Sequence, residues 1–370
     1  MLKGDPPRYR SVTTFSIVYF RKILHERDGV QKTVKDVLDS ICWRDLVNGP
    51  RIFVKVNLIS SEFIPGQCTS PLILDGLLKE ITLDSFDVVV GDADLAAAKQ
   101  CDRASVVWGH KKIAQRYGAI FKNLSKESTT RVKVGGKIID TIDIPESILN
   151  ADSIISIPVL KTHCLTGMTC ALKNLWGLLP RARHQYHLMV DDAIADINYL
   201  FKDKLSFTLV DGTICMEGNG PRTGKPRMVG CTFGGSDPVA IDAFAANLIG
   251  VELPAHVRLA EERGIGRTEF KVEGDPFECL SFEKPNMRTQ PIFFWEMLLR
   301  KTKVKPLFFD TKIFDALAWI AAMYNSLYYY ELHGRRYRRE VMQTWLGQEL
   351  VNFLNNLFSN SFGHRSSSKH

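Results

Sequence analysis

The sequence has no apolar run as long as the roughly 20 residues that a membrane-spanning helix needs. Its longest candidate is the stretch of residues 316–330, which ends before Glu331. The first residues, Met1 to Pro7, contain neither an apolar core nor a cleavage site, so no signal peptide is visible. These absences predict a cytoplasmic protein with no transmembrane segment.

The sequence also lacks closely spaced cysteines. None of its eight cysteines forms a Cys-x-x-Cys pair, and the two nearest are Cys164 and Cys170. Zinc ribbons and ferredoxin-type clusters need thiolates at tight spacing, so an iron–sulfur cluster or zinc ribbon held by this chain is not expected. The spacing instead predicts free and mostly buried thiols.

Composition excludes several classes of protein. Hydrophobic residues make up 45% and charged residues 24%, which are globular values and exclude disordered, collagen-like and coiled-coil chains. The net charge is +7, and residues 301–370 contribute +5 of it with ten basic and five acidic side chains. A basic tail alone is weak support for nucleic acid as a partner, and we do not expect one.

Strand and helix patterns alternate along residues 30–250, which predicts an α/β fold with a mostly parallel sheet and helices on both faces. Period-two or β-rich segments predict strands over residues 51–58, 87–92, 153–158, 207–212 and 227–233. Helical spacing predicts helices over residues 30–42, 71–81, 169–176, 191–201 and 238–249. The last of these should begin after the capping residue Asp237 and end before Gly250.

The character of the chain changes after residue 285. Residues 291–330 contain eleven aromatic side chains, and four arginines follow between Arg335 and Arg339. We therefore expect an α/β domain over residues 1–285, a helical C-terminal extension over 286–360 and a disordered tail over 361–370. A last amphipathic helix is expected over 341–358. The aromatic segment could pack over the sheet, bury a homodimer interface, or lie at a membrane surface.

A candidate anion site follows the strand that ends near Pro158. Lys161, Thr162 and His163 lead into a helix, and open α/β sheets bind ligands where a strand feeds a helix. Lys173 and Asn174 occur beside apolar residues of that helix. Lys173 either reaches solvent or faces the same pocket as Lys161, and Asn174 could equally satisfy backbone groups.

A second candidate is a metal site. His184 and His187 are three residues apart and could share a helix face, and His163 could join them if the loops meet. A divalent metal held by His163, His187 and the carboxylate of Glu217 is one hypothesis. Partly exposed imidazoles without a metal are the alternative.

The remaining candidate site residues are acidic or polar, and they occur in a glycine-rich segment and in the helix predicted after Asp237. Asp211 ends a predicted strand, and the loop that follows contains Gly212, Gly218 and Gly220 with Glu217 and Asn219 as polar tips. Such a loop suits close approach of the backbone to a ligand, and a tight turn is the alternative. Asp242 lies among apolar residues and is either a site carboxylate or a partner of Lys161 or Lys173.

Taken together, residues 51–94 and 153–250 resemble the family named domain of unknown function 362. Five segments carry the likeness: residues 55–58, 68–71, 160–163 with 171–177, 211–221 and 236–242. The family label states no activity. Many relatives carry an appended ferredoxin-like iron–sulfur module, and this chain lacks the cysteine run that such a module needs.

These observations leave three functional interpretations. The first is an enzyme acting on a small anionic metabolite, with Lys55, Asn57, Lys161, Thr162, Lys173, Asn174, Asp211 and Asn219 binding substrate. His163, Glu217 and Asp242 would then be the acid–base groups, and the reaction is not assigned. The second is a redox or electron-transfer protein of this iron–sulfur-associated family that takes its cluster or its electrons from a partner. The third is a peripheral membrane or scaffold protein.

Overall fold

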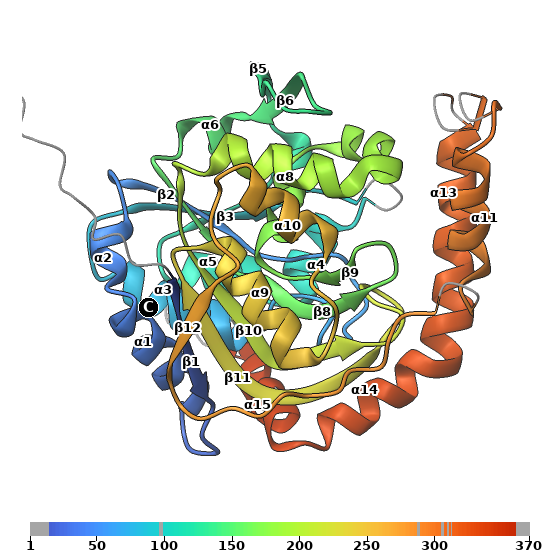
Figure 1. Cartoon of the computed structure of the whole chain (residues 1–370). Helices are drawn as coiled ribbons and strands as arrows, with labels where there is room; N and C mark the ends of the chain where they lie inside the picture. The colour runs from blue at the N-terminus through green and yellow to red at the C-terminus, as the bar shows by residue number, and fades with distance from the viewer. Residues whose placement is uncertain are drawn as a thin grey trace, which may run out of the picture.

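The computed structural model describes residues 15–95, 99–286, 289–304, 307–308, 311 and 313–359. The tail predicted over 361–370 lies outside these residues. The described part is built around a mixed sheet flanked by helices (Figure 1). Among the described residues, no helix combines the length and apolarity that crossing a bilayer requires.

The main path of the sheet contains eight strands, and two more are attached to it. Its order is β12 (Phe270–Gly274), β1 (Ser16–Lys22), β11 (Lys225–Gly235), β10 (Leu205–Glu217), β7 (Ser153–Ser156), β2 (Arg51–Lys55), β3 (Asp87–Asp92) and β4 (Ile120–Asn123). From β10 to β4 all neighbours are parallel, whereas β11 is antiparallel to both β10 and β1. The attached strands are β8 (Val159–His163), parallel to β10, and β9 (Gly167–Thr169). The sheet is therefore mostly parallel, as the sequence predicted.

Helices cover both faces of this sheet. One face packs against α1 (Gly29–Ser40), α3 (Pro71–Ile81), α4 (Cys101–Val107), α5 (His110–Arg116) and α15 (Trp345–Ser359). The other packs against α7 (Ala171–Asn174), α8 (Val190–Phe201), α9 (Pro238–Ile249) and α10 (Ala255–Glu262). The alternation of side chains along β2 explains this arrangement. Ile52 and Val54 pack against the helices of the first face, and Phe53 packs against those of the second.

Smaller elements complete the body. These are α2 (Trp43–Leu46), α6 (Glu146–Asn150), the hairpin of β5 (Thr129–Lys133) and β6 (Thr141–Pro145), and the 3-10 helices η1 (Leu124–Lys126), η2 (Leu175–Leu178) and η3 (Arg181–Met189). The C-terminal region adds α11 (Pro291–Arg300), α13 (Ile313–Tyr324), the π-helix η5 (Asn325–Gly334) and α14 (Arg335–Met342). Figure 1 shows α11 and α13 at the edge of the molecule, whereas α15 returns to the core.

Several predicted elements have different bounds in the structure. The strands predicted over 51–58 and 153–158 are shorter, since β2 ends at Lys55 and β7 at Ser156. The strand predicted to end at Gly212 continues to Glu217 through a bulge between Gly212 and Ile214, so Asp211 does not end a strand. Gly212 lies close against β11, where a Cβ atom would stand 2.6 Å from Cys231 Sγ. This glycine therefore permits close strand pairing instead of opening a loop.

Two further differences concern helices. The helix predicted over 169–176 begins only at Ala171, because Thr169 belongs to β9, and it tightens into η2 at Leu175. The helix predicted over 341–358 is two helices. Thr344 Oγ1 accepts a hydrogen bond from Gly347 N at 3.2 Å, so this residue caps a new helix after α14 has ended.

The cap of α9 is the clearest confirmed prediction and gives a test. Asp237 Oδ1 accepts from Val239 N at 2.8 Å and Ala240 N at 3.1 Å, while Oδ2 accepts from Ser16 Oγ at 2.7 Å and Arg267 N at 2.9 Å. We expect Asp237→Ala to lower the free energy of unfolding by about 2 kcal/mol, the upper end for a lost N-cap. Urea denaturation followed by circular dichroism measures it. Asp237→Asn keeps the capping acceptor Oδ1 but places an NH2 donor where Oδ2 accepts from Arg267 N, so it should lose less than Asp237→Ala but more than nothing. Equal losses for both variants would contradict this account.

Candidate functional site

A cavity of about 520 Å³ lies where strands β2, β3 and β8 end. One wall of the cavity is formed by polar side chains at the ends of these strands, and the opposite wall is formed by α11 and α13. This position agrees with the rule that ligands of open α/β sheets bind beyond the carboxyl ends of parallel strands. The polar and aromatic lining includes Lys55, Asn57, Asp92, Lys161, His163, Cys164, Lys173, Asn174, Trp176, His187, Gln290, Trp295, Glu296 and Arg300.

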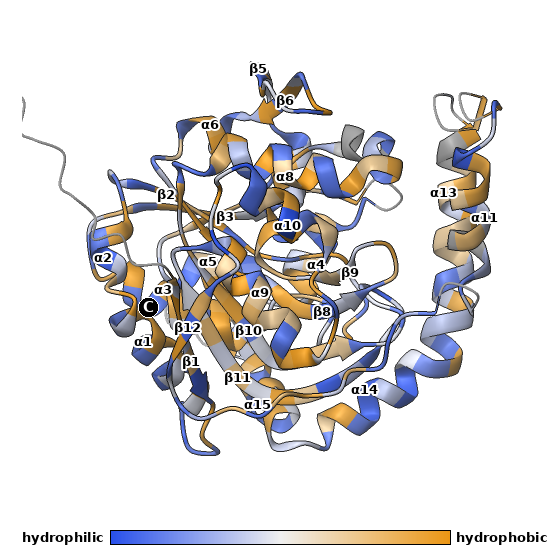
Figure 2. Ribbon diagram, in the orientation of Figure 1, coloured by the Kyte–Doolittle hydropathy of each residue, from blue (hydrophilic) through white to orange (hydrophobic). Residues whose placement is uncertain are grey.

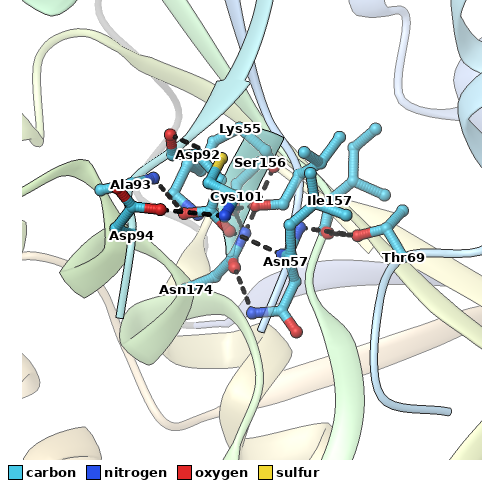
Figure 3. Close-up of polar contacts among 12 residues, drawn as sticks. Lys55, Asn57, Thr69, Asp92, Ala93, Asp94, Cys101, Ser156, Ile157 and Asn174 are labelled. Atoms are coloured by element: carbon cyan, nitrogen blue, oxygen red, sulfur yellow. Dashed lines mark hydrogen bonds and ion pairs between the residues drawn. The ribbon is translucent and has the colours of Figure 1, made fainter. Parts of the chain in front are cut away.

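A buried ion pair forms the floor of the cavity. Lys55 Nζ lies 2.8 Å from Asp92 Oδ1, and both side chains are almost completely buried. Lys55 also donates to Val56 O at 2.6 Å, and Asp92 accepts from Leu58 N at 2.6 Å and Ala93 N at 2.7 Å. The charge of Lys55 is therefore cancelled by a carboxylate that is itself saturated with donors. Figure 3 shows the pair and the amides around it.

Lys161 has a different environment at similar depth. Its Nζ donates to Asn57 Oδ1 and Gln67 O, both at 2.6 Å, and its side chain is buried. These acceptors are neutral, and Lys161 makes no ion pair with a carboxylate within the described residues. Burial lowers the pKa of Lys161 to about 8, although the charges of Asp211 and Asp92 act in the opposite direction. An ammonium has three donors, so one remains for a ligand in the cavity.

Two asparagines hold the lysines in place. Asn57 Oδ1 accepts from Lys161, and Asn57 Nδ2 faces Asn174 Oδ1 at 3.4 Å. Asn174 Nδ2 in turn donates to Ser156 Oγ at 3.0 Å and Lys55 O at 3.3 Å (Figure 3). The backbone of Asn57 is tied to Thr69, whose hydroxyl reaches Ile157 O at 2.8 Å. Asn174 thus lines the cavity and also donates a hydrogen bond to a backbone carbonyl, the two roles that the sequence left open.

His163 lines the cavity as a neutral imidazole. Its Nδ1 accepts from Leu165 N at 3.0 Å and from Thr166 N at 3.3 Å, so the ring proton is assigned to Nε2. Burial, followed by the positive charge of Lys173, holds the pKa of His163 well below its usual value. The ring can therefore donate a hydrogen bond from Nε2 but is poorly placed to accept a proton, because its acceptor nitrogen Nδ1 is already bound by two backbone amides.

The other side of the cavity carries a second group of charges. His187 Nδ1 lies 3.6 Å from Glu296 Oε1, and Arg300 in the next turn of α11 binds the same oxygen at 2.7 Å and 3.0 Å. Burial acts to raise the pKa of Glu296, but His187 and Arg300 together hold it below its usual range. Burial lowers the pKa of His187. Lys173 lines the same cavity from α7.

Two predicted binding residues lie just behind the lining. Thr162 Oγ1 donates to Gly218 O at 2.8 Å, and Asp211 accepts from Ser70 N at 2.7 Å and Thr213 Oγ1 at 2.6 Å. Burial raises the pKa of Asp211. Both side chains are buried in backbone contacts, so they position the strands that carry Lys161 and do not line the described cavity.

Three other candidates have structural partners outside the cavity. Glu217 pairs with Arg227 at 2.8 Å, and Asn219 binds Thr289 Oγ1 at 2.6 Å and Asn286 N at 2.8 Å. Asp242 accepts from Ala171 N at 2.6 Å and Leu172 N at 3.1 Å, which fixes the first turn of α7. Burial raises the pKa of Asp242 to about 6. Asp242 is therefore not the partner of Lys161 or Lys173 that the sequence allowed.

The proposed metal ligands are not brought together. Glu217 lies apart from His163 and His187, which line the cavity, and the side chain of His184 is outside the described part. Among the described side chains, no group of three or more His, Cys, Asp or Glu could hold a metal ion. The eight cysteines are free thiols, and burial raises the pKa of Cys68 and Cys164 to about 11. The described side chains therefore do not bring together the three ligands that the sequence hypothesis needs.

Sequence reasoning missed several lining residues. The sequence prediction includes Asp92 only as the last residue of a strand, although an acid at the carboxyl end of a strand beside Lys55 is a usable signal. Trp295, Glu296 and Arg300 come from α11, and nothing in their spacing indicates that this helix reaches the strand ends. Gln290 donates to Asn219 O and to Thr223 Oγ1, both at 3.1 Å, and so ties the start of α11 to the body.

The ion pair on the cavity floor gives a second test. Lys55→Met leaves the Asp92 carboxylate buried without its cation, so we expect the free energy of unfolding to fall by about 3–5 kcal/mol. Lys55→Met with Asp92→Asn removes both charges and should recover a large part of that loss. Urea denaturation of the two single variants and the double variant measures the coupling. Additive losses would show that the two side chains do not stabilise each other.

Comparison with known proteins gives a family and a few distant relatives. A thylakoid-associated protein of Synechocystis sp. is 29% identical over 128 residues, which is 32% of this chain and 39% of that protein. The lactate racemase apoprotein of Thermoanaerobacterium thermosaccharolyticum is 16% identical with a TM-score of 0.39, covering 64% of this chain and 57% of the other. A protein of Thermotoga maritima is 12% identical with a TM-score of 0.36, covering 65% and 59%.

The chain thus spans less than two thirds of the length of each of these proteins. The family described as a domain of unknown function (DUF362) matches residues 52–247, which is more than half of the chain. That region contains β2, β3, β8 and α7, and with them the lysines and asparagines of the cavity floor. The protein belongs to the DUF362 family.

Proposed function

We propose that the protein is an enzyme acting on a small compound with an anionic group and an apolar part, bound in the cavity at the strand ends. The observation that carries this proposal is Lys161. It is a buried ammonium whose two protein partners are neutral oxygens at 2.6 Å. A buried cation without a counter-charge is costly, and a carboxylate or phosphate oxygen from a ligand would supply that charge.

The charge balance of the lining supports an anionic ligand. Four cationic side chains, those of Lys55, Lys161, Lys173 and Arg300, face two carboxylates, those of Asp92 and Glu296. Asp92 is paired with Lys55 and Glu296 with Arg300. The imidazoles of His163 and His187 add no charge near neutral pH, because burial lowers the pKa of both. Lys161, whose hydrogen bonds go to neutral oxygens, is therefore the lining cation on which this proposal rests.

The apolar wall gives the second half of the ligand. The lining contributed by α11 and α13 includes Trp295, Leu299, Leu317, Ala318, Ile320 and Ala321. A purely ionic metabolite would leave this surface in contact with water, whereas an apolar ligand chain would cover it. We therefore expect the anionic group at Lys161 and the apolar part against the two helices.

The same residues define which chemistry the site can support. Lys161 has a pKa of about 8, so it can hold or move a proton at Nζ near neutral pH. His163 can donate a hydrogen bond from Nε2 to an oxygen that gains negative charge, without itself becoming charged. Glu217 and Asp242 have no such role in this proposal, because their carboxylates are bound elsewhere.

Straight-chain carboxylates from butanoate to octanoate test this ligand class. We expect affinity to rise about threefold to fourfold for each methylene, because each one is buried against the α11 and α13 wall. Titration calorimetry measures it. Lys161→Met should abolish the binding, and Lys79→Met, which changes an exposed lysine of α3, should leave it unchanged. Binding that is as tight in Lys161→Met as in wild type would refute the site.

The pH dependence provides an independent test on the unmodified protein. The anion needs the protonated form of Lys161, whose pKa is about 8 in the free protein. Octanoate stays ionised across this range, so its affinity should be constant near neutral pH and fall about tenfold per pH unit well above that value. His163 should add no step near neutral pH, since it is already neutral. A profile that stays flat through alkaline pH would exclude Lys161 as the anion-binding cation.

A further inference from the structure

The described residues of 291–334, which we call the arm, expose an unusual amount of apolar surface. Trp319 is 64% exposed, Leu332 63%, Leu327 61%, and the arm adds further exposed Phe, Leu, Ile, Met and Tyr side chains. Figure 2 shows α11 and α13 as a largely hydrophobic pair of helices at the edge of the molecule. Monomeric proteins rarely leave so many large apolar side chains together in water, so this surface is expected to meet an apolar partner.

The exposed side of α13 repeats this pattern along its length. Ile313, Trp319 and Met323 are exposed on α13, and Leu327 is exposed in η5, which follows directly. The sequence from Ile313 to Tyr330 contains a single charged residue, Asp315. A solvent-facing helix normally presents polar residues on this side. The arm therefore has two apolar sides, one toward the cavity and one toward the exterior.

Basic residues gather at both ends of this apolar surface. Residues 291–340 contain nine basic and five acidic side chains. Lys301 and Lys303 are exposed where α11 ends, and Arg335, Arg336, Arg338 and Arg339 are exposed in α14. Aromatic side chains with flanking lysines and arginines are the composition of segments that lie in the headgroup region of a bilayer.

We propose that the outer face of the arm docks on an anionic lipid bilayer, with Trp319, Leu327 and Leu332 entering the interface and the flanking basic residues contacting lipid phosphates. This surface needs no folding step, because the base of the arm is fixed to the body. Tyr329 OH donates to Gly224 O at 2.5 Å, and Asn219 Nδ2 donates to Thr289 Oγ1 at 2.6 Å.

The cavity and the docking face meet at two residues. Trp295 and Ile320 both line the cavity and are 59% and 54% exposed, so they lie at its mouth. Docking would bring that mouth against the membrane and give an apolar ligand a path that avoids water. The docking proposal itself stands on the exposed surface and holds whatever the ligand is.

Vesicle flotation tests the docking with the full chain. The probes are vesicles of phosphatidylglycerol mixed with phosphatidylcholine, and vesicles of phosphatidylcholine alone. We expect binding to the anionic vesicles that weakens at high salt, and much weaker binding to the uncharged ones. The affinity of the double variant Trp319→Glu with Leu327→Glu for the anionic vesicles should be lower by about tenfold or more, because the variant removes two large apolar side chains from the interface.

The matched control is Leu83→Glu, which changes an equally exposed leucine (71%) outside the arm and should bind like wild type. Thermal unfolding must be unchanged in each variant, and octanoate binding must persist in Trp319→Glu with Leu327→Glu, since neither residue lines the cavity. Vesicle binding that survives in this double variant would overturn the proposal. So would a wild-type dimer in light scattering that the double variant dissociates, because the arm would then be a contact between two copies.

Discussion

The buried pair of Lys55 and Asp92 is the contact around which the rest of the cavity is arranged. It joins the last residues of the adjacent strands β2 and β3 at 2.8 Å, and Asp92 also holds Leu58 N in the loop beyond β2. The pair leaves no space for a side chain at residue 177, where a Cβ atom would lie 2.6 Å from Lys55 Nζ. Because removing one partner leaves a buried charge, the two strands, the Leu58 loop and η2 are constrained together.

This pairing separates the roles of two lysines that look alike in the sequence. Lys55 is neutralised by Asp92, whereas Lys161 at similar depth meets only the neutral oxygens of Asn57 and Gln67. An Asp at the position of Asn57 would neutralise Lys161 as Asp92 neutralises Lys55, and an anionic ligand would then gain little. The amide at residue 57 is therefore as important to the site as the lysine, because it orients the ammonium without cancelling its charge.

The sequence could predict the sheet, the helix bounded by Asp237 and Gly250, and the place of Lys161 and His163 near the strand ends, whereas it left open whether Lys173 and Asn174 would face the same cavity. These follow from local pattern and from the rule that parallel strand ends share an edge. It could not predict that Asp242 would cap α7 or that Glu217 would pair with Arg227, since a carboxylate in a loop looks the same whether its partner is a ligand, a backbone amide or an arginine. Nor could it place α11 against the strand ends, because that contact depends on tertiary packing.

The division between the family region and the arm explains why family membership alone does not identify a ligand. The matched residues 52–247 supply Lys55, Lys161 and Lys173, the two asparagines and the imidazoles of the lining, whereas Arg300 comes from α11. In the function proposed above, these groups would recognise an anionic group and little else. The wall that would distinguish one anion from another lies outside that region, in α11 and α13. Hydrogen bonds at the floor fix the orientation of a ligand, whereas the shape and apolarity of the opposite wall decide which apolar groups can be attached to the anionic group of that ligand. In the proposed function, the selectivity of the cavity therefore depends on the arm.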